Sequence, residues 1–408
     1  MPNRLKIFLV VTILLMILSV AAAQAERVLG QPDFTSNAVG HGPEGLSFPL
    51  GIAVDSAGGI YVADRNNHRT LYYAPDGDAV ADRVYGQHGN FNSYIVNFDG
   101  LGGSGSPSAD TLANPTYVAL DSQGGLYVAD RDNHRVLYYA PGDTTADRVY
   151  GQFGSFTLNV VNADGTMLIS GVGTPDANNL GVYALTIALD ASDGLYISDS
   201  SNHRVLYYAP DGDTTADRVY GQFDSFNSAV KNNDGTGRPG APGASSLNFP
   251  RGIAFDASGG IFVADRDNNR ILYFNPDGDT VADRVYGQYG SLTSAVANNN
   301  GSGMSGAPSA ESLASPRALA IDETGGLWAI DSLNSRMLYF AADGDTVADK
   351  VLGQFGSFTT GVANNDGNGA SGTPGAGNLN GAQAFALAGG RLYISDTGNN
   401  RILVVPVP

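Results

Sequence analysis

The sequence contains no cysteine and only one tryptophan among its 408 residues. Without cysteine there are no disulfide bonds, thiol nucleophiles or thiolate ligands for zinc, so packing and hydrogen bonds must hold the fold. Basic residues are also scarce: 22 Lys and Arg stand against 40 Asp and Glu, a formal net charge of −18. Such a negative protein repels phosphate backbones and anionic lipids, so we expect neither nucleic acids nor membrane surfaces as partners.

Long hydrophobic runs are missing after the amino-terminal segment. Within it, Arg4 and Lys6 precede an apolar stretch from Ile7 to Val20, and Ala-Gln-Ala at residues 23–25 fits a cleavage site. This stretch is shorter than the roughly 20 residues that a membrane-spanning helix needs. We therefore predict a signal peptide at residues 1–25, a secreted or extracytoplasmic protein, and no membrane insertion after cleavage.

A sixfold repeat organises residues 26–408. The pattern Asp-x-x-x-x-Arg returns at intervals of 65 to 69 residues, and Val-(Leu/Tyr)-Gly-Gln also occurs six times, first at Val28. A single active site needs no sixfold copy, so we interpret the Asp and Arg as a structural clamp at the ends of a turn. The six pairs are Asp64 and Arg69, Asp130 and Arg135, Asp199 and Arg204, Asp265 and Arg270, Asp331 and Arg336, and Asp396 and Arg401.

Each repeat contains four short runs of β-branched and aromatic residues separated by Gly, Pro, Asn and Asp. In the first repeat these runs are residues 52–54, 60–63, 70–73 and 83–86, and such runs are typical of strands. Six such units predict an all-β, six-bladed β-propeller with four antiparallel strands per blade, forming one domain over residues 26–408. The fourth-strand motif at Val28 precedes any first strand, so we predict that the amino-terminal strand completes the last blade and closes the ring.

The segments Pro49–Asp55, Gly59–Asp64 and Asn67–Tyr72 together resemble the NHL repeat. The resemblance extends along the whole of residues 26–408 and implies a propeller fold, but members of this family serve several unrelated roles, so function must be argued from the site. Some members are zinc-dependent lyases with histidines from several blades around the central channel.

Three of the five histidines occupy one repeat position, namely His68, His134 and His203, where later repeats have Asn269, Ser335 and Asn400. Equivalent positions on separate blades lie around a ring and need not converge on one ion. We therefore assign no metal ligand and keep the three histidines as candidate ligand-binding residues.

An insertion precedes the first strand of most repeats. Its Asn/Asp-Gly core lies at residues 97–100, 162–165, 232–235, 298–301 and 364–367, each followed by a Gly-, Ser- and Pro-rich tract. Insertions in a repeat protein map to one face, often the binding face. These loops are suited to neutral polar ligands such as glycans or peptides, although a spacer without a ligand is an equal alternative.

The turns between the third and fourth strands are rich in aspartate, as at Asp76, Asp78 and Asp82. Closely spaced carboxylates can hold calcium, but Asp-Gly is also an ordinary turn dipeptide. We favour a solvated turn, with no cofactor and with calcium as the alternative.

The repeats differ at the position that follows the proline of the innermost strand, or that aligns with it where the third and sixth repeats lack this proline. This position should lie at the mouth of the central channel. Arg251 and Arg317 occupy this position in neighbouring blades, and the other residues there are Leu50, Thr116, Leu185 and Gln383. Two adjacent arginines can hold a carboxylate or phosphate through bidentate hydrogen bonds. We predict a ligand site at Arg251, Arg317, Thr116 and Gln383.

These observations favour a non-catalytic binding scaffold for a glycan, peptide or protein, held on the face that carries the insertions. We assign no catalytic residue and expect a monomer. The alternatives are a calcium- or zinc-dependent lyase or lactonase-like hydrolase with its site at the channel, and a purely structural surface-layer component.

Overall fold

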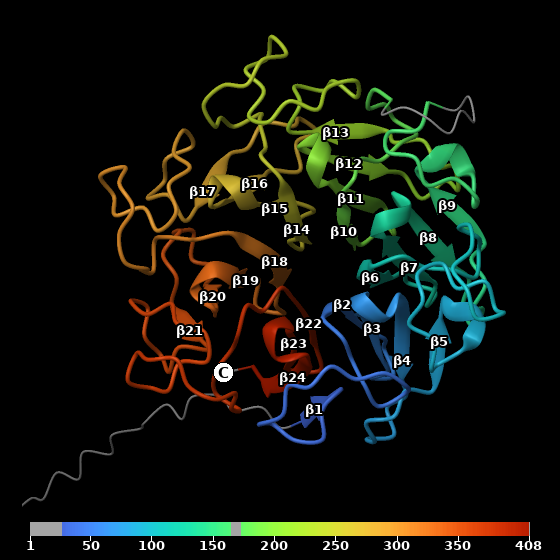
Figure 1. Ribbon diagram of the computed structural model, residues 1–408. Coiled ribbons are helices and arrows are strands. Elements are labelled where there is room, and N and C mark those ends of the chain that lie inside the picture. The colour runs from blue at the N-terminus through green and yellow to red at the C-terminus, as the bar shows by residue number, and fades with distance from the viewer. Residues whose placement is uncertain (1–26, 165–172, 408) are drawn as a thin grey trace, which may run out of the picture.

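The computed structural model describes residues 27–164 and 173–407 as a ring of six antiparallel four-stranded sheets (Figure 1). This confirms the predicted six-bladed β-propeller. The predicted signal peptide lies outside the described residues. Within the described part of the chain, no helix has the length and apolar character needed to span a membrane.

In blades 1 to 5 the strands follow in chain order from the channel outwards, and in blade 6 the first strand of the chain takes the outermost place. Blade 1 comprises β2 (Pro49–Val54), β3 (Ile60–Asp64), β4 (Arg69–Tyr73) and β5 (Arg83–Tyr85); blade 2 comprises β6 (Pro115–Leu120), β7 (Leu126–Asp130), β8 (Arg135–Tyr139) and β9 (Arg148–Tyr150); blade 3 comprises β10 (Ala184–Leu189), β11 (Leu195–Asp199), β12 (Arg204–Tyr208) and β13 (Arg218–Tyr220). Blade 4 comprises β14 (Pro250–Phe255), β15 (Ile261–Asp265), β16 (Arg270–Phe274) and β17 (Arg284–Tyr286); blade 5 comprises β18 (Pro316–Ile321), β19 (Leu327–Asp331), β20 (Arg336–Phe340) and β21 (Lys350–Leu352). Blade 6 comprises β22 (Ala384–Ala388), β23 (Arg391–Asp396), β24 (Arg401–Pro406) and β1 (Arg27–Leu29).

The helices are single 3₁₀ turns. Six of them join the second and third strands of the blades: η1 (Arg65–Asn67), η3 (Arg131–Asn133), η5 (Ser200–Asn202), η6 (Arg266–Asn268), η7 (Ser332–Asn334) and η8 (Thr397–Asn399). Two others, η2 (Gln87–Gly89) and η4 (Gln152–Gly154), follow the fourth strands of blades 1 and 2. The clamp aspartate directly precedes each turn of the first set, and the clamp arginine follows one residue after it. Asp64 and Arg69 are also the last cross-strand pair of β3 and β4.

Blade 6 joins the two ends of the described chain. Strand β1 pairs antiparallel with β24, with Val28 opposite Leu403 and Leu29 opposite Ile402 (Figure 1). Leu29 and Ile402 are both completely buried, in a hydrophobic cluster that also contains Ile52 of blade 1. The pairing therefore covers the outer edge of β24, and β1 becomes the outermost strand of blade 6.

The hydrophobic core lies between neighbouring sheets. One cluster, for example, contains Tyr127 and Val136 of blade 2 together with Ile187 and Leu206 of blade 3. The innermost strands approach one another most closely where glycine follows the channel-mouth residue. A Cβ atom on Gly51 would lie 2.4 Å from Cα of Tyr117, so only glycine allows blades 1 and 2 to meet at that distance.

Candidate binding site at the channel mouth

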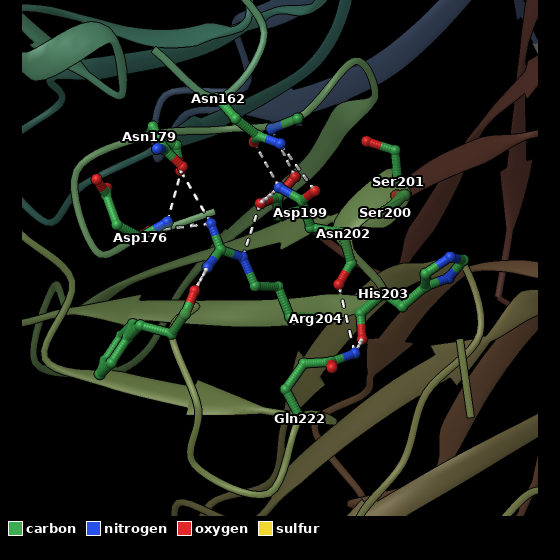
Figure 2. A network of polar contacts seen from close by, with 12 residues as sticks. Asn162, Asp176, Asn179, Asp199, Ser200, Ser201, Asn202, His203, Arg204 and Gln222 are labelled. Atoms are coloured by element: carbon green, nitrogen blue, oxygen red, sulfur yellow. Dashed lines mark hydrogen bonds and ion pairs between the residues drawn. The ribbon is translucent and has the colours of Figure 1, made fainter. Parts of the chain in front are cut away.

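The repeated Asp and Arg form a buried network in every blade, shown for blade 3 in Figure 2. The Nε of Arg204 donates to Oδ2 of Asp199 at 2.8 Å, and its Nη2 donates to the carbonyl oxygens of Asp176 and Asn179, each at 3.0 Å. The Nδ2 of Asn202 donates to the same Asp199 oxygen at 2.7 Å. The guanidinium therefore joins the turn to the loop that leads into the blade.

All six pairs have the same geometry, with Nε to Oδ2 distances of 2.6 to 2.8 Å and side chains that are 0% exposed. Sequence spacing indicates a pair at the ends of a turn, but it does not show that the pair is buried. Burial changes its energetics: an exposed pair contributes ~0–1 kcal/mol, whereas removing one partner of a buried pair leaves an uncompensated charge and costs several times more. These twelve residues therefore have a structural role.

The insertions are anchored through their first asparagine. In blade 3, Asn162 and Asn202 exchange side-chain amide hydrogen bonds at 3.3 and 2.8 Å (Figure 2). Reciprocal pairs of this kind recur as Asn97 with Asn133, Asn232 with Asn268, Asn298 with Asn334, and Asn364 with Asn399. The asparagine side chains that we predicted to bind a ligand are thus hydrogen-bonded to another asparagine of the fold at this position.

In blades 1, 3 and 4 the repeated histidine position holds the blade to the next one. Nδ1 of His68 accepts a hydrogen bond from the backbone N–H of Asn114 at 3.0 Å, and Nδ1 of His203 accepts one from Phe249 at 3.1 Å. In the following blade, Oδ1 of Asn269 takes the same role by accepting from the N–H of Ser315 at 2.9 Å. An acceptor at Nδ1 requires the neutral imidazole.

Burial lowers the pKa of His203 from 6.5 to about 4, and it also lowers the pKa of His68 and His134. The unfolded chain therefore binds more protons than the folded protein between about pH 6.5 and pH 4, so stability is lost as the pH falls through this window. We expect about 1–3 kcal/mol of this loss to vanish in the double variant His68→Asn and His203→Asn. Urea unfolding at pH 7 and pH 4.5 measures it, and equal pH dependence in the wild-type protein and the variant would contradict the assigned role.

Residues from four blades meet at the channel mouth. Nη1 of Arg317 in blade 5 donates to Oε1 of Gln383 beside blade 6 at 2.7 Å. The hydroxyl of Tyr117 in blade 2 reaches across to donate to the backbone carbonyl of Gln383 at 3.0 Å. Burial raises the pKa of Tyr117, and the positive charges of Arg251 in blade 4 and of Arg317 lower it in part. The structure thus places the candidates Arg251, Arg317 and Gln383 near one another, together with Tyr117.

The guanidinium of Arg251 has no hydrogen bond or ion pair with any described residue. Its Nε is buried without an acceptor, and so is the Nε of Arg317. The nearest partner of Arg251 is an aromatic one, with Cζ 5.0 Å from the ring centroid of Phe249. The positive charge of a largely buried cation is poorly compensated when its only partner is the face of an aromatic ring.

Three more arginines belong to this site, and the sequence analysis did not assign them. Arg65, Arg131 and Arg266 each directly follow a clamp aspartate, at the first position of the 3₁₀ turn. Cζ of Arg131 lies 4.5 Å from the ring centroid of Tyr183, and Cζ of Arg266 lies 5.2 Å from that of Phe249. The available signal was the residue after the aspartate, which is arginine in blades 1, 2 and 4 but Ser or Thr in the others.

We call Arg65, Arg131, Arg251, Arg266 and Arg317 the arginine cluster. Burial, followed by the charges of Arg317 and Arg266, lowers the pKa of Arg251 to about 9; burial and Arg266 lower that of Arg317 to about 10. Both groups remain protonated at neutral pH. Asp132 and Asp267 neutralise part of the charge through pairs of 3.3 Å with Arg131 and Arg266. The cluster is therefore an excess of positive charge within a strongly negative protein.

The remaining candidates lie nearby or apart. Thr116 and Leu50 are buried at the starts of their strands, and the side chain of Leu185 lies outside the described part of the structure. His68, His134 and His203 lie in the turns between the second and third strands. Of these, His68 and His203 accept a hydrogen bond from the next blade.

The aspartate-rich turns are capped by their own carboxylates. Asp76 accepts from the backbone N–H of Asp78 at 3.1 Å, Asp78 accepts from Val80 at 2.9 Å, and Asp82 accepts from Ala74 at 2.7 Å. Among the residues that the structure describes, no group of three or more His, Cys, Asp and Glu is placed to hold a metal ion. The geometry gives these turns a structural role.

Sequence comparison finds the repeat that the motifs resemble. A model of the NHL repeat matches residues 46–69, 112–139 and 247–274, in blades 1, 2 and 4. No curated protein matches the chain significantly.

Solved structures show the fold alone, because their sequence identities are low. A protein of unknown function from Bacteroides thetaiotaomicron is 15% identical with a TM-score of 0.56, and the alignment covers 94% of this chain and 76% of that one. A gluconolactonase from Xanthomonas campestris is 13% identical with a TM-score of 0.50, over 95% and 97% of the two chains. A virginiamycin B lyase from Staphylococcus aureus is 11% identical with a TM-score of 0.48, over 94% and 99%.

Proposed function

Since this chain is a six-bladed β-propeller that contains three NHL repeats, we propose that it is a non-catalytic binding scaffold, exported from the cell, that captures an acidic group of its partner at the arginine cluster. The partner is a peptide, protein or glycan that carries a carboxylate. The observation that carries this proposal is the largely buried Arg251 guanidinium, which has no acceptor among the described residues.

The free donors of the cluster suit a carboxylate. A guanidinium presents parallel N–H groups that match the two oxygens of a carboxylate, and the bond is strengthened by charge and by low local dielectric. Gln383 already holds one side of Arg317 at 2.7 Å, so the orientation of that side chain is set before a ligand arrives. A ligand anion would compensate charges that the fold leaves unpaired.

The charge distribution of the protein favours anion binding at the arginine cluster over other parts of its surface. The net charge of −18 repels anions elsewhere, whereas the mouth concentrates arginines from blades 1, 2, 4 and 5. A local positive site with low-dielectric walls focuses the field and raises the rate of anion association. The insertions begin at the same ends of the blades, so a partner held at the mouth also meets these loops.

A metal-dependent lyase or lactonase is the alternative, and the channel residues do not fit it. Such a site needs several Asp, Glu, Asn or His ligands directed at one ion, whereas the described mouth residues are arginine, leucine, threonine, glutamine and tyrosine. No metal-binding group of three or more His, Cys, Asp and Glu occurs in the described ranges. Elemental mass spectrometry of protein purified without chelators tests this, and one tightly held calcium or zinc per chain would contradict the proposal.

The binding test uses the double variant Arg251→Ala and Arg317→Ala. A panel of acidic peptides and uronic-acid oligosaccharides is titrated by calorimetry, with amidated or reduced neutral counterparts. For the tightest acidic ligand we expect the variant to bind at least about 100-fold more weakly.

Arg284→Ala is the matched control, since Arg284 lies in the same blade as Arg251 but on the exposed outer strand β17, over the ring of Tyr273. It should bind like the wild-type protein. Equal affinity for acidic and neutral ligands, or unchanged affinity in the double variant, would contradict the proposal.

A further inference from the structure

Four exposed aromatic side chains form an arc along the edge of the face that carries the channel mouth. Each directly follows the Gly-Gln of the fourth-strand motif: Phe153, Phe223, Tyr289 and Phe355 in blades 2 to 5. Their exposed fractions are 41, 46, 40 and 50%, which is high for phenylalanine and tyrosine. We call these four residues the aromatic crown; His88 and Pro32 stand at the same position in the two remaining blades.

The crown lies at the same ends of the blades as the 3₁₀ turns and the mouth. In blade 3, Nε2 of Gln222, next to Phe223, donates to the backbone carbonyl of His203 at 2.9 Å. Pro250, which precedes the mouth residue Arg251, pairs with Asp265 at the beginning of the corresponding turn in blade 4. The crown is therefore the outer edge of the face whose centre is the arginine cluster.

Core packing does not explain the crown. Three residues after each crown position, the same loop carries Phe156, Phe226, Leu292 or Phe358, and these side chains pack against the hydrophobic clusters between the sheets. Each loop thus has one inward apolar residue that stabilises the fold and one outward ring. A polar residue at the outward position would serve solubility better.

The backbone at the crown is left-handed. The φ angles are +49° for Phe153, +51° for Phe223, +51° for Tyr289 and +51° for Phe355. Asparagine and glycine adopt this conformation readily, while bulky side chains do so at a cost. Aromatic residues in four consecutive blades therefore stand where local conformation favours other residue types, which points to a role for the ring itself.

The rings of Phe223 and Tyr289 rest on the insertion that leads into the next blade. A Cβ atom on Gly235 would lie 3.2 Å from Cε1 of Phe223, and one on Gly301 would lie 3.3 Å from Cδ1 of Tyr289. The rings thus rest on glycines of the Asn/Asp-Gly core, close enough that a larger residue would displace them. This arrangement presents a supported ring with exposed surface beside the Asn-, Asp- and Gly-rich core of the insertion.

We propose that the aromatic crown is a second binding site, for a neutral polysaccharide whose sugar rings stack on successive aromatic side chains. The rings are separated by one blade each, which suits a repeating polymer better than the continuous apolar patch of a protein partner. The negative charge of the protein opposes an anionic polysaccharide. Several weak contacts to one chain give avidity without a deep pocket at any of them.

This inference is independent of the arginine cluster, and its test keeps the two apart. The wild-type protein is passed through gels that contain soluble neutral polysaccharides (hydroxyethylcellulose, xyloglucan, glycogen and galactomannan), and its retardation is compared with that in blank gels. The test variant replaces all four crown residues with asparagine, which suits left-handed backbone. It should therefore fold, with a Tm no lower than that of the wild-type protein.

We expect retardation by at least one of these polymers, a loss of at least tenfold in apparent affinity in the quadruple variant, and a smaller loss in Phe355→Asn alone. The matched control is the pair Leu101→Asn and Met304→Asn, exposed apolar residues of the insertions outside the crown, which should be retarded like the wild-type protein. The Arg251→Ala and Arg317→Ala variant should also be unaffected. A wild-type protein that no polymer retards, a quadruple variant that is retarded equally, or a change in oligomeric state without a change in retardation would overturn the inference.

Discussion

Replacing Arg270 with methionine is expected to lower the free energy of unfolding by about 3–5 kcal/mol. The substitution leaves the fully buried Asp265 carboxylate without its ion-pair partner at 2.7 Å. It also removes the donors to the carbonyl oxygens of Gly243 and Ser246, at 2.9 and 3.0 Å. Urea unfolding at pH 7 followed by circular dichroism measures the loss.

The control for this variant is Arg284→Met, which removes an exposed arginine of the same blade and should change stability by less than about 0.5 kcal/mol. Asp265→Asn should also destabilise the protein, and combining it with Arg270→Met should cost less than the sum of the single losses, because the two residues form one interaction. A loss below about 1 kcal/mol for Arg270→Met would contradict a structural role for the clamp.

Deleting residues 27–30 from the mature protein is expected to abolish the monomeric, cooperatively unfolding state. The deletion removes β1, uncovers the outer edge of β24, and exposes the cluster around Ile402 that Leu29 covers. An uncovered edge pairs with another chain, so we expect oligomers in light scattering and a broadened or absent urea transition.

A synthetic peptide of residues 27–34 provides the matched rescue, since it supplies the missing strand in trans. Adding it in excess should restore the monomer and part of the lost stability, while a peptide with Val28 and Leu29 changed to aspartate should not. A deletion variant that stays monomeric with the stability of the wild-type protein would show that β1 contributes nothing to the ring.

The architecture could be predicted because the repeat specifies each blade separately. Strand positions in the first repeat agree within a few residues, although β2 begins at Pro49 rather than at Ile52. The mouth position of Arg251 and Arg317 also followed from repeat alignment. Alignment cannot give the direction in which a side chain extends across the ring. The contact between Tyr117 in blade 2 and Gln383 beside blade 6 therefore became evident only in three dimensions.

The larger part of the arginine cluster could not be predicted for the same reason. Arg65, Arg131 and Arg266 lie in a turn that the pattern marks as polar and exposed, whereas in the ring these turns lie close to the innermost strands of neighbouring blades. Nε of Arg266, for example, donates to Oγ of Ser315 at 3.1 Å, a residue 49 positions later. The histidine contacts are equally non-local, since Nδ1 of His203 meets the backbone of Phe249 in the next blade.

The anion site at the arginine cluster is tested by thermal unfolding of the wild-type protein and of the Arg251→Met, Arg317→Met variant. Each protein is unfolded with and without citrate, in a buffer free of other carboxylates and phosphate. Unpaired buried charges destabilise a fold, and a ligand that binds only the folded state stabilises it. We therefore expect two results. Without citrate the double variant has the higher Tm, and with citrate only the wild-type protein gains. A variant with the lower Tm in ligand-free buffer, together with an equal gain from citrate in both proteins, would contradict an anion site at the arginine cluster.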